Sequence, residues 1–145
     1  MTGLTRTQGL LLVAVGAGGA LGALARYSVE LAGNVGPSWF PWPTLSINVS
    51  GAFVLGLAVA LLGDRARPTP YLRAFVTIGL LGGYTTFSTW TVETVVLIRH
   101  HAVWTAVVYA LLTVVVGIAA VYLGGAAGRA LPAGGGDKHE ARRRR

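Results

Sequence analysis

Four long stretches of this chain carry no charged side chain. They contain 19, 33, 19 and 29 residues and lie at 7–25, 31–63, 74–92 and 100–128. A membrane-spanning helix needs about 20 mostly apolar residues, so each stretch is long enough to cross a bilayer once. The pattern predicts an all-α integral membrane protein with four transmembrane helices and little else. We place the four spans at about 8–25, 44–62, 74–98 and 103–123.

Composition excludes several classes of protein. Charged residues make up 12% of the 145 residues, about half the share found in an ordinary soluble domain. The chain has no Cys, which excludes disulfides, thiolate metal sites and cysteine catalysis. The net charge is +7, but five of the twelve basic residues lie in the last eight positions. No basic face with interleaved aromatic residues remains, so we expect no nucleic-acid partner.

No enzyme motif is complete. The segment from Gly79 to Gly83 resembles a phosphate-binding loop, but no Lys followed by Ser or Thr comes after it. His100 and His101 are adjacent, whereas two ligands share one helix face when they are four residues apart. No Ser/His/Asp set is visible, so we expect neither catalysis nor an organic cofactor.

The basic residues of the loops predict the orientation of the chain. With four spans, one side carries ten Lys and Arg residues and the other carries two. Without the five basic residues near the C-terminus the bias is still five to two. Cytoplasmic loops are enriched in Lys and Arg, so both termini are expected in the cytoplasm. We expect residues 131–145 to form a disordered basic tail after a membrane domain of residues 1–130.

The first span has an alternative interpretation. Its basic start and its ending, Ala23-Leu24-Ala25, also fit a secretory signal peptide. We prefer a membrane span because the segment is rich in glycine and contains Gly18 and Gly22, four residues apart. Small residues at this spacing let two helix backbones approach closely in lipid.

The third span is the least regular. Gly79, Gly82 and Gly83 precede a run of hydroxyl-bearing residues, and both residue types are poor helix formers. The segment predicts a broken helix, whose freed carbonyls can hold a cation and whose freed N–H groups can face an anion. A glycine-kinked packing helix, with hydroxyls bonded to its own carbonyls, is the alternative. Asn48 in the second span either bonds two helices together or serves as a ligand.

Three stretches of the chain carry a family resemblance. They are Gly18–Tyr27, Thr44–Gly56 and Gly79–Glu93, and the most specific part is Gly82-Gly83-Tyr84-Thr85-Thr86-Phe87-Ser88-Thr89. Together with the four-span layout, they resemble the Fluc (CrcB) fluoride channels, small four-helix bacterial membrane proteins, over about residues 8–125. The resemblance implies a passive, fluoride-selective anion channel in the bacterial plasma (inner) membrane that exports cytoplasmic fluoride.

The resemblance also implies an assembly and a metal ion. An antiparallel, dual-topology dimer would contain two fluoride pores and a central structural sodium ion, Na⁺. By motif position, the backbone carbonyls of Gly82 and Thr85 would hold this ion. A buried cation between two anion pores would offset the cost of bringing like charges together.

The same resemblance assigns pore residues. Asn48 would be the pore amide, and Phe87 the first of two pore phenylalanines, which meets the anion with its positive ring edge. The hydroxyls of Thr86, Ser88 and Thr89 can donate hydrogen bonds. The other candidates are Tyr109 and Thr113 on the fourth span as pore-facing polar residues, and Arg26 and Glu93 as vestibule or gating residues.

Two features depart from the family pattern. Trp90 stands where the second phenylalanine is expected; its indole keeps a positive edge and adds an N–H donor. The ten-to-two charge bias is unlike a chain that inserts in both orientations, so one alternative is a subunit of a heterodimeric channel with an oppositely oriented homologue. Another alternative is a small proton-coupled exporter, for which Glu93 is the candidate membrane-embedded acid.

Overall fold

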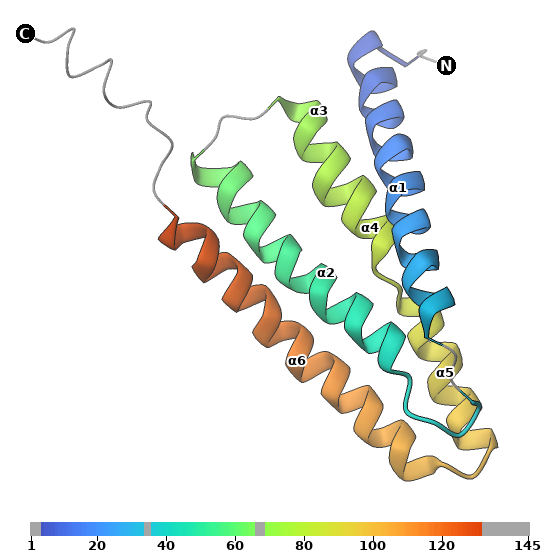
Figure 1. Ribbon diagram of the computed structural model, residues 1–145. Coiled ribbons are helices and arrows are strands. Elements are labelled where there is room, and N and C mark those ends of the chain that lie inside the picture. Colours follow the sequence, from blue (N-terminus) through green and yellow to red (C-terminus); the bar gives the residue numbers. More distant parts are fainter. Residues whose placement is uncertain (1–3, 34–35, 66–68, 132–145) are drawn as a thin grey trace, which may run out of the picture.

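The computed structural model describes residues 4–33, 36–65 and 69–131, and in these residues all regular structure is helical. The predicted tail falls outside this part of the chain, apart from Leu131. The elements are α1 (Arg6–Ala32), α2 (Trp42–Ala60), the π-helical turn η1 (Leu61–Arg65), α3 (Pro70–Arg73), the π-helical segment η2 (Ala74–Leu80), α4 (Leu81–Tyr84), α5 (Phe87–Arg99) and α6 (Val103–Ala130) (Figure 1).

Three of the four predicted spans are continuous helices that are long and apolar enough to cross a membrane: α1, the segment 42–63 and α6. The third predicted span is divided among η2, α4 and α5. α1 and α6 each continue seven residues beyond the predicted ends at 25 and 123. A charged residue ends an apolar stretch but not a helix, and in α1 Arg26 and Glu30 pair one turn apart, at 3.8 Å.

The helices pack as two pairs joined at one end. α2 and α6 lie side by side, and α1 lies along η2 and α4 (Figure 1). α5 continues beyond the end of α1 and packs against the first half of α6. The chain therefore brings the junction between α4 and α5 against the middle of α2.

Glycines set the closest approach between the paired helices. Gly18 and Gly22 of α1 face the turns of η2 and α4. Gly56 of α2 faces Val121 and Gly125 of α6, and Gly124 of α6 faces Phe53 of α2. A Cβ at any of these four positions would collide with a backbone carbonyl oxygen of the opposite element. The packing role predicted for the Gly18 and Gly22 pair is confirmed, and α1 is an integral part of the fold.

The predicted break in the third span lies at Thr85 and Thr86. α4 ends at Tyr84, both threonines are extended (φ −74°, ψ 156° and φ −144°, ψ 122°), and α5 begins at the next residue. The glycines that suggested the break lie in the helical turns before it. A Cβ at Gly83 would collide with the backbone of α1, so this glycine serves the packing of two helices rather than the interruption.

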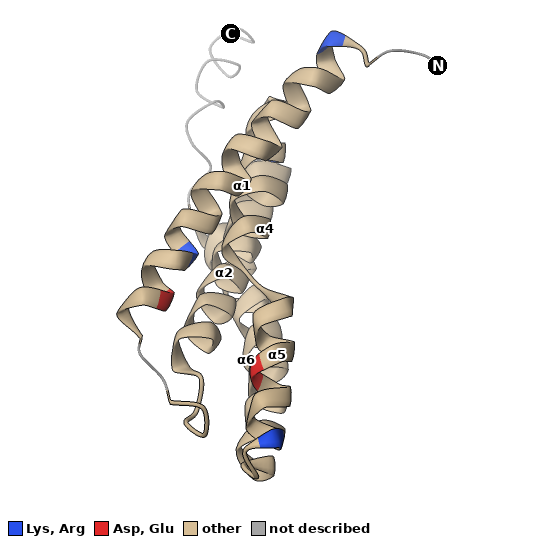
Figure 2. Ribbon diagram, turned by 90° about the vertical axis from the view of Figure 1, so that its right-hand side faces the viewer, with Lys and Arg blue, Asp and Glu red and all other residues tan. Residues whose placement is uncertain are grey.

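Buried side chains are few. Leu45, Leu97, Ala106 and Tyr109 form a small core where α2, α5 and α6 meet, whereas large apolar side chains on every long helix are exposed. Charged residues are equally sparse, and Figure 2 shows long uncharged stretches of helix between them. Such surfaces suit contact with lipid or with another membrane chain.

Candidate functional site

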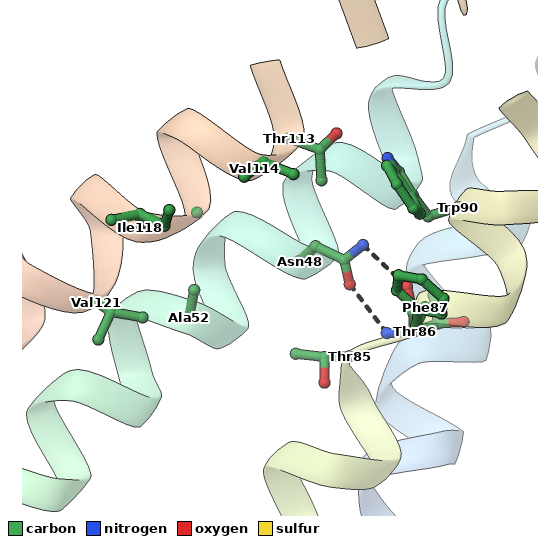
Figure 3. A pocket seen from close by; sticks show the side chains of 11 residues that line it. Asn48, Ala52, Thr85, Thr86, Phe87, Trp90, Thr113, Val114, Ile118 and Val121 are labelled. Carbon is green, nitrogen blue, oxygen red and sulfur yellow. Dashed lines mark hydrogen bonds between the residues drawn. The ribbon is translucent and has the colours of Figure 1, made fainter. Parts of the chain in front are cut away.

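A mainly apolar groove with a few polar side chains lies beside the break. Its volume is about 390 Å³, and it is open along one side. α2, the break with the start of α5, and the middle of α6 form its walls (Figure 3). The lining residues are Asn48, Ala52, Thr85, Thr86, Phe87, Trp90, Thr113, Val114, Gly117, Ile118 and Val121.

The side chain of Asn48 is bonded to both peptide groups of Thr86 (Figure 3). Asn48 Nδ2 donates to the Thr86 carbonyl at 3.0 Å, and the Thr86 N–H donates to Asn48 Oδ1 at 2.9 Å. The amide thus replaces the helical acceptor that the Thr86 N–H loses at the break, as a buried peptide group requires. One of the two Nδ2 hydrogens is used in this pairing, and the second is left for another acceptor.

The break releases several backbone carbonyls from their helical partners, among them those of Gly82 and Thr85. In an α-helix each N–H donates to the carbonyl four residues earlier. The Thr86 N–H donates to Asn48 rather than to Gly82, and the Thr89 N–H donates to Thr86 Oγ1, at 3.1 Å, rather than to Thr85. Gly82 is exposed, with open space where a side chain would lie. The carbonyls of Gly82 and Thr85 are therefore suited to a cation, which takes neutral oxygen ligands.

Hydroxyl groups gather where α5 begins. Thr86 Oγ1 caps the helix through the bond from Thr89, donates to Thr89 Oγ1 at 3.0 Å and lies 3.3 Å from Ser88 Oγ. Thr86 is buried, Thr89 is half-buried and Ser88 is exposed. The three predicted hydroxyl donors are thus close together, but of the three Thr86 lines the groove, and Ser88 and Thr89 do not.

Two aromatic rings border the groove one turn apart on α5. The rings of Phe87 and Trp90 have centroids 5.1 Å apart and planes inclined at 39°. Phe87 is 77% exposed, whereas Trp90 is half-buried and packs against the core. Neither ring is stacked flat on the other, so ring edges as well as faces are presented to the groove.

Glu93 is half-buried at a separate pocket and is hydrogen-bonded to Tyr109 of the core. The Tyr109 hydroxyl donates to Glu93 Oε2 at 2.6 Å, and Thr44 Oγ1 donates to Oε1 at 2.8 Å. Tyr109 is fully buried and does not line the groove, whereas Thr113, one turn further along α6, does. Arg26, the other candidate for a vestibule, lies on α1 and pairs with Glu30.

Sequence reasoning missed several lining residues and one polar partner. Ala52 follows Asn48 by four residues and Gly117 follows Thr113 by four, so helical spacing places each pair on one face and could have found both. Thr44 bonds Glu93 across 49 residues of chain, and no sequence pattern signals that contact.

These features define a class: a multi-pass helical membrane protein with a groove beside an interrupted helix. The chain belongs to the family described as "CrcB-like protein, Camphor Resistance (CrcB)", whose profile matches residues 13–125.

The match to curated relatives extends over most of the length of each relative. A protein of Mycobacterium bovis named "Fluoride-specific ion channel FluC 1" is 43% identical over 112 residues, which is 77% of this chain and 85% of that protein. Proteins of Solibacter usitatus and Agrobacterium fabrum named "Fluoride-specific ion channel FluC" are 43% and 42% identical, over 79% and 81% of this chain and 93% and 94% of theirs.

Proposed function

We propose that this chain forms a passive, fluoride-selective anion channel that lets fluoride leave the cell. The observation that carries the proposal is the groove lined by Asn48, Thr86 and the rings of Phe87 and Trp90, with the hydroxyls of Ser88 and Thr89 next to that of Thr86. The relatives named as fluoride-specific ion channels support the same function. No organic cofactor takes part in it.

The groove suits fluoride because it offers hydrogen-bond donors without a fixed positive charge. Fluoride is small and tightly hydrated, so a pore must supply donors in place of water. The second Nδ2 hydrogen of Asn48 and the hydroxyls of Thr86, Ser88 and Thr89 can do so. The edge of Phe87 is electropositive and can meet an anion from the side. The remaining wall, on α6, is mainly apolar and excludes bulk water.

The pore is completed in this proposal by a second subunit of opposite orientation. Phe87 and Ser88 are exposed in the single chain, and a second chain packed on this side would enclose both grooves, giving two pores per dimer. Thr113 would line the pore from α6. Tyr109 would lie behind the pore wall, hydrogen-bonded to Glu93. The ten-to-two distribution of basic residues favours one orientation per chain, so a heterodimer with an oppositely oriented homologue is the second candidate assembly.

A sodium ion at the dimer centre fits the released carbonyls of Gly82 and Thr85. Each chain supplies two carbonyls, so two chains supply four. When bound, the ion would add one positive charge between two anion paths. In the chain itself, the Asn48 bond to Thr86 and the cap on α5 keep these carbonyls free of helical partners.

Passive flow is sufficient for export. Fluoride enters a cell as neutral HF from acidic surroundings and dissociates inside, so its own gradient drives the anion out through an open path. The proposed location is the plasma (inner) membrane of a bacterium. A proton-coupled exporter would need an acid that faces the path, whereas Glu93 lies outside the groove, at a separate pocket, with its carboxylate oxygens bonded to Thr44 and Tyr109.

The test is fluoride efflux from liposomes that contain only this protein, followed with a fluoride electrode. A channel carries net charge, so efflux in potassium salts should be fast with valinomycin, slow without it, and absent for chloride. Efflux that needs a proton gradient but no valinomycin would support the exporter instead. No efflux from folded protein would reject the self-sufficient homodimer, and co-expression with an oppositely biased homologue would then test the heterodimer.

A further inference from the structure

A second groove lies between the first half of α1 and η2. Its volume is about 340 Å³, and it shares no lining residue with the groove beside the break. Leu12 of α1 and Ile78 of η2 border it and are 58% and 63% exposed, so it opens on the outer surface of the single chain. The full lining, apolar except for Gln8, is Leu4, Gln8, Leu11, Leu12, Val15, Ala74 and Ile78.

The groove has the depth of one leaflet of a bilayer. α1 contains 27 residues and is therefore about 40 Å long, which is the thickness of a bilayer with its headgroups. Its first residue, Arg6, then lies at the level of the headgroups. Between Arg6 and Val15 the helix rises about 14 Å, and one leaflet contains about 15 Å of hydrocarbon. A lipid tail has this extent, whereas a membrane-spanning helix is about twice as long.

Two arginines lie at the outer end of this groove. α3 and η2 run beside the first half of α1 in the same direction (Figure 1), so Arg73, which directly precedes the lining residue Ala74, lies at the same end as Arg6. Both arginine side chains are exposed. The acidic residues whose side chains the structure describes, Glu30 and Glu93, have other partners. Within the described part of the chain, the two positive charges are therefore uncompensated.

Gln8 adds a hydrogen-bond donor at the same end. Its Oε1 accepts from the N–H and from the hydroxyl of Thr5, at 2.9 and 3.1 Å, and this pairing fixes the orientation of the amide. An amide nitrogen carries two hydrogens, so the Nε2 group of Gln8 is the part of this side chain that can donate to a ligand. The groove thus combines apolar walls with positive charge and a donor at its outer end.

We propose that this groove binds one anionic phospholipid, with an acyl chain along Leu11, Val15 and Ile78 and the phosphate group at Arg73 and Gln8. The apolar walls accept any acyl chain, whereas the arginines select a headgroup with net negative charge. A guanidinium group can bind a phosphate through two parallel hydrogen bonds, and basic residues at the membrane surface attract anionic lipids. The proposal does not depend on which ion the chain carries.

The first test locates the acyl chain. Full-length protein in mixed micelles is irradiated with phosphatidylglycerol that carries a diazirine in one acyl chain, and the cross-linked residues are identified by mass spectrometry. The cross-links should concentrate on residues 8–15 and 74–78. Unlabelled phosphatidylglycerol should suppress them in a saturable way, and phosphatidylcholine with the same acyl chains should do so only at much higher concentration.

The second test removes one positive charge at the headgroup. In Arg73→Gln the concentration of unlabelled phosphatidylglycerol that halves cross-linking should rise roughly fivefold, the effect of one basic residue near an anionic lipid surface. Arg99→Gln is the matched control, because Arg99 is also exposed but lies in the last turn of α5, outside the groove. It removes the same charge and should leave that concentration unchanged.

Three outcomes would overturn the inference. Cross-links spread evenly over the apolar helices would show that no single site exists. Equal competition by phosphatidylcholine, or an equal effect of the two Arg variants, would show that the arginines at the groove do not select the lipid. Cross-links that disappear when the protein is converted from monomer to dimer would show that a second copy covers the groove. None of these results bears on fluoride efflux, which tests the proposed function separately.

Discussion

The pairing of Asn48 with Thr86 predicts a large loss of stability when the amide is removed. Asn48→Ala leaves the Thr86 N–H without a partner in a part-buried position, while the Thr86 carbonyl, at the N-cap of α5, keeps the first N–H of the helix. An unsatisfied buried group costs about 1–3 kcal/mol, so we expect the free energy of unfolding to fall by about 1–3 kcal/mol. Asn48→Asp keeps an acceptor for the Thr86 N–H, so its loss of stability should be smaller.

The two variants also separate stability from transport. Both lose the donor that faces the groove, and the Asp variant adds a negative charge there, so we expect its fluoride efflux to be abolished even where the protein remains folded. Unfolding is followed by circular dichroism during titration of mixed detergent micelles, and efflux is measured in liposomes with a fluoride electrode.

Ser46→Ala is the matched control, two residues away on α2. The Ser46 hydroxyl is exposed and donates to the Pro43 carbonyl of its own helix at 2.7 Å, so its loss should change stability by less than about 0.5 kcal/mol. The reasoning is refuted if Asn48→Ala unfolds within the same margin as this control, because the two bonds to Thr86 would then not hold the break.

Three further predictions follow from other parts of the structure. Gly22→Ala should lower the free energy of unfolding by about 1–3 kcal/mol or more, because the new Cβ collides with the Leu80 carbonyl. Gly16→Ala, where the Cβ would lie in open space, should leave it unchanged. Equal unfolding midpoints for the two variants would contradict the close helix contact. Glu93→Gln should lower the free energy of unfolding by about 1–3 kcal/mol, because one of the two hydroxyl donors, Thr44 or Tyr109, loses its acceptor. Fluoride efflux should persist in this variant. A complete loss of efflux from folded protein would favour proton coupling. Sodium at a hundred times its dissociation constant should raise the free energy of unfolding by about 2.7 kcal/mol, so replacing it with N-methylglucamine should lower the unfolding midpoint. An unchanged midpoint over a wide range of sodium concentration argues against the bound ion.

The pattern of charges predicted most of the fold. Uncharged stretches located α1, α2 and α6, because helices in lipid must be apolar over their whole buried length. Charge could not locate helix ends, as the continuation of α1 through Arg26 and Glu30 shows. Helix propensity predicted the break but not its position. That position is set by Asn48, 38 residues earlier in the chain, and local propensity carries no information on such a contact.

The candidate site was predictable in its members more than in their arrangement. The motif assigned Asn48, Phe87, Trp90 and Thr113, and all four line one groove. Spacing also grouped Tyr109 with Thr113, but the longer Tyr109 side chain lies in the core with its hydroxyl on Glu93. Which way a long side chain points depends on the neighbours available to it, and these come from other helices.

The interruption at Thr85 and Thr86 has an electrostatic consequence. Aligned peptide dipoles leave about half a negative charge at the C-terminal end of a helix and half a positive charge at the N-terminal end. The turns that end at Tyr84 direct the negative end toward the released carbonyls, and α5 directs its positive end toward the groove. One segment therefore presents opposite polarities on the two sides of a two-residue gap, using backbone alone. The stretch 74–92 therefore carries partial charges of both signs although it contains no charged side chain.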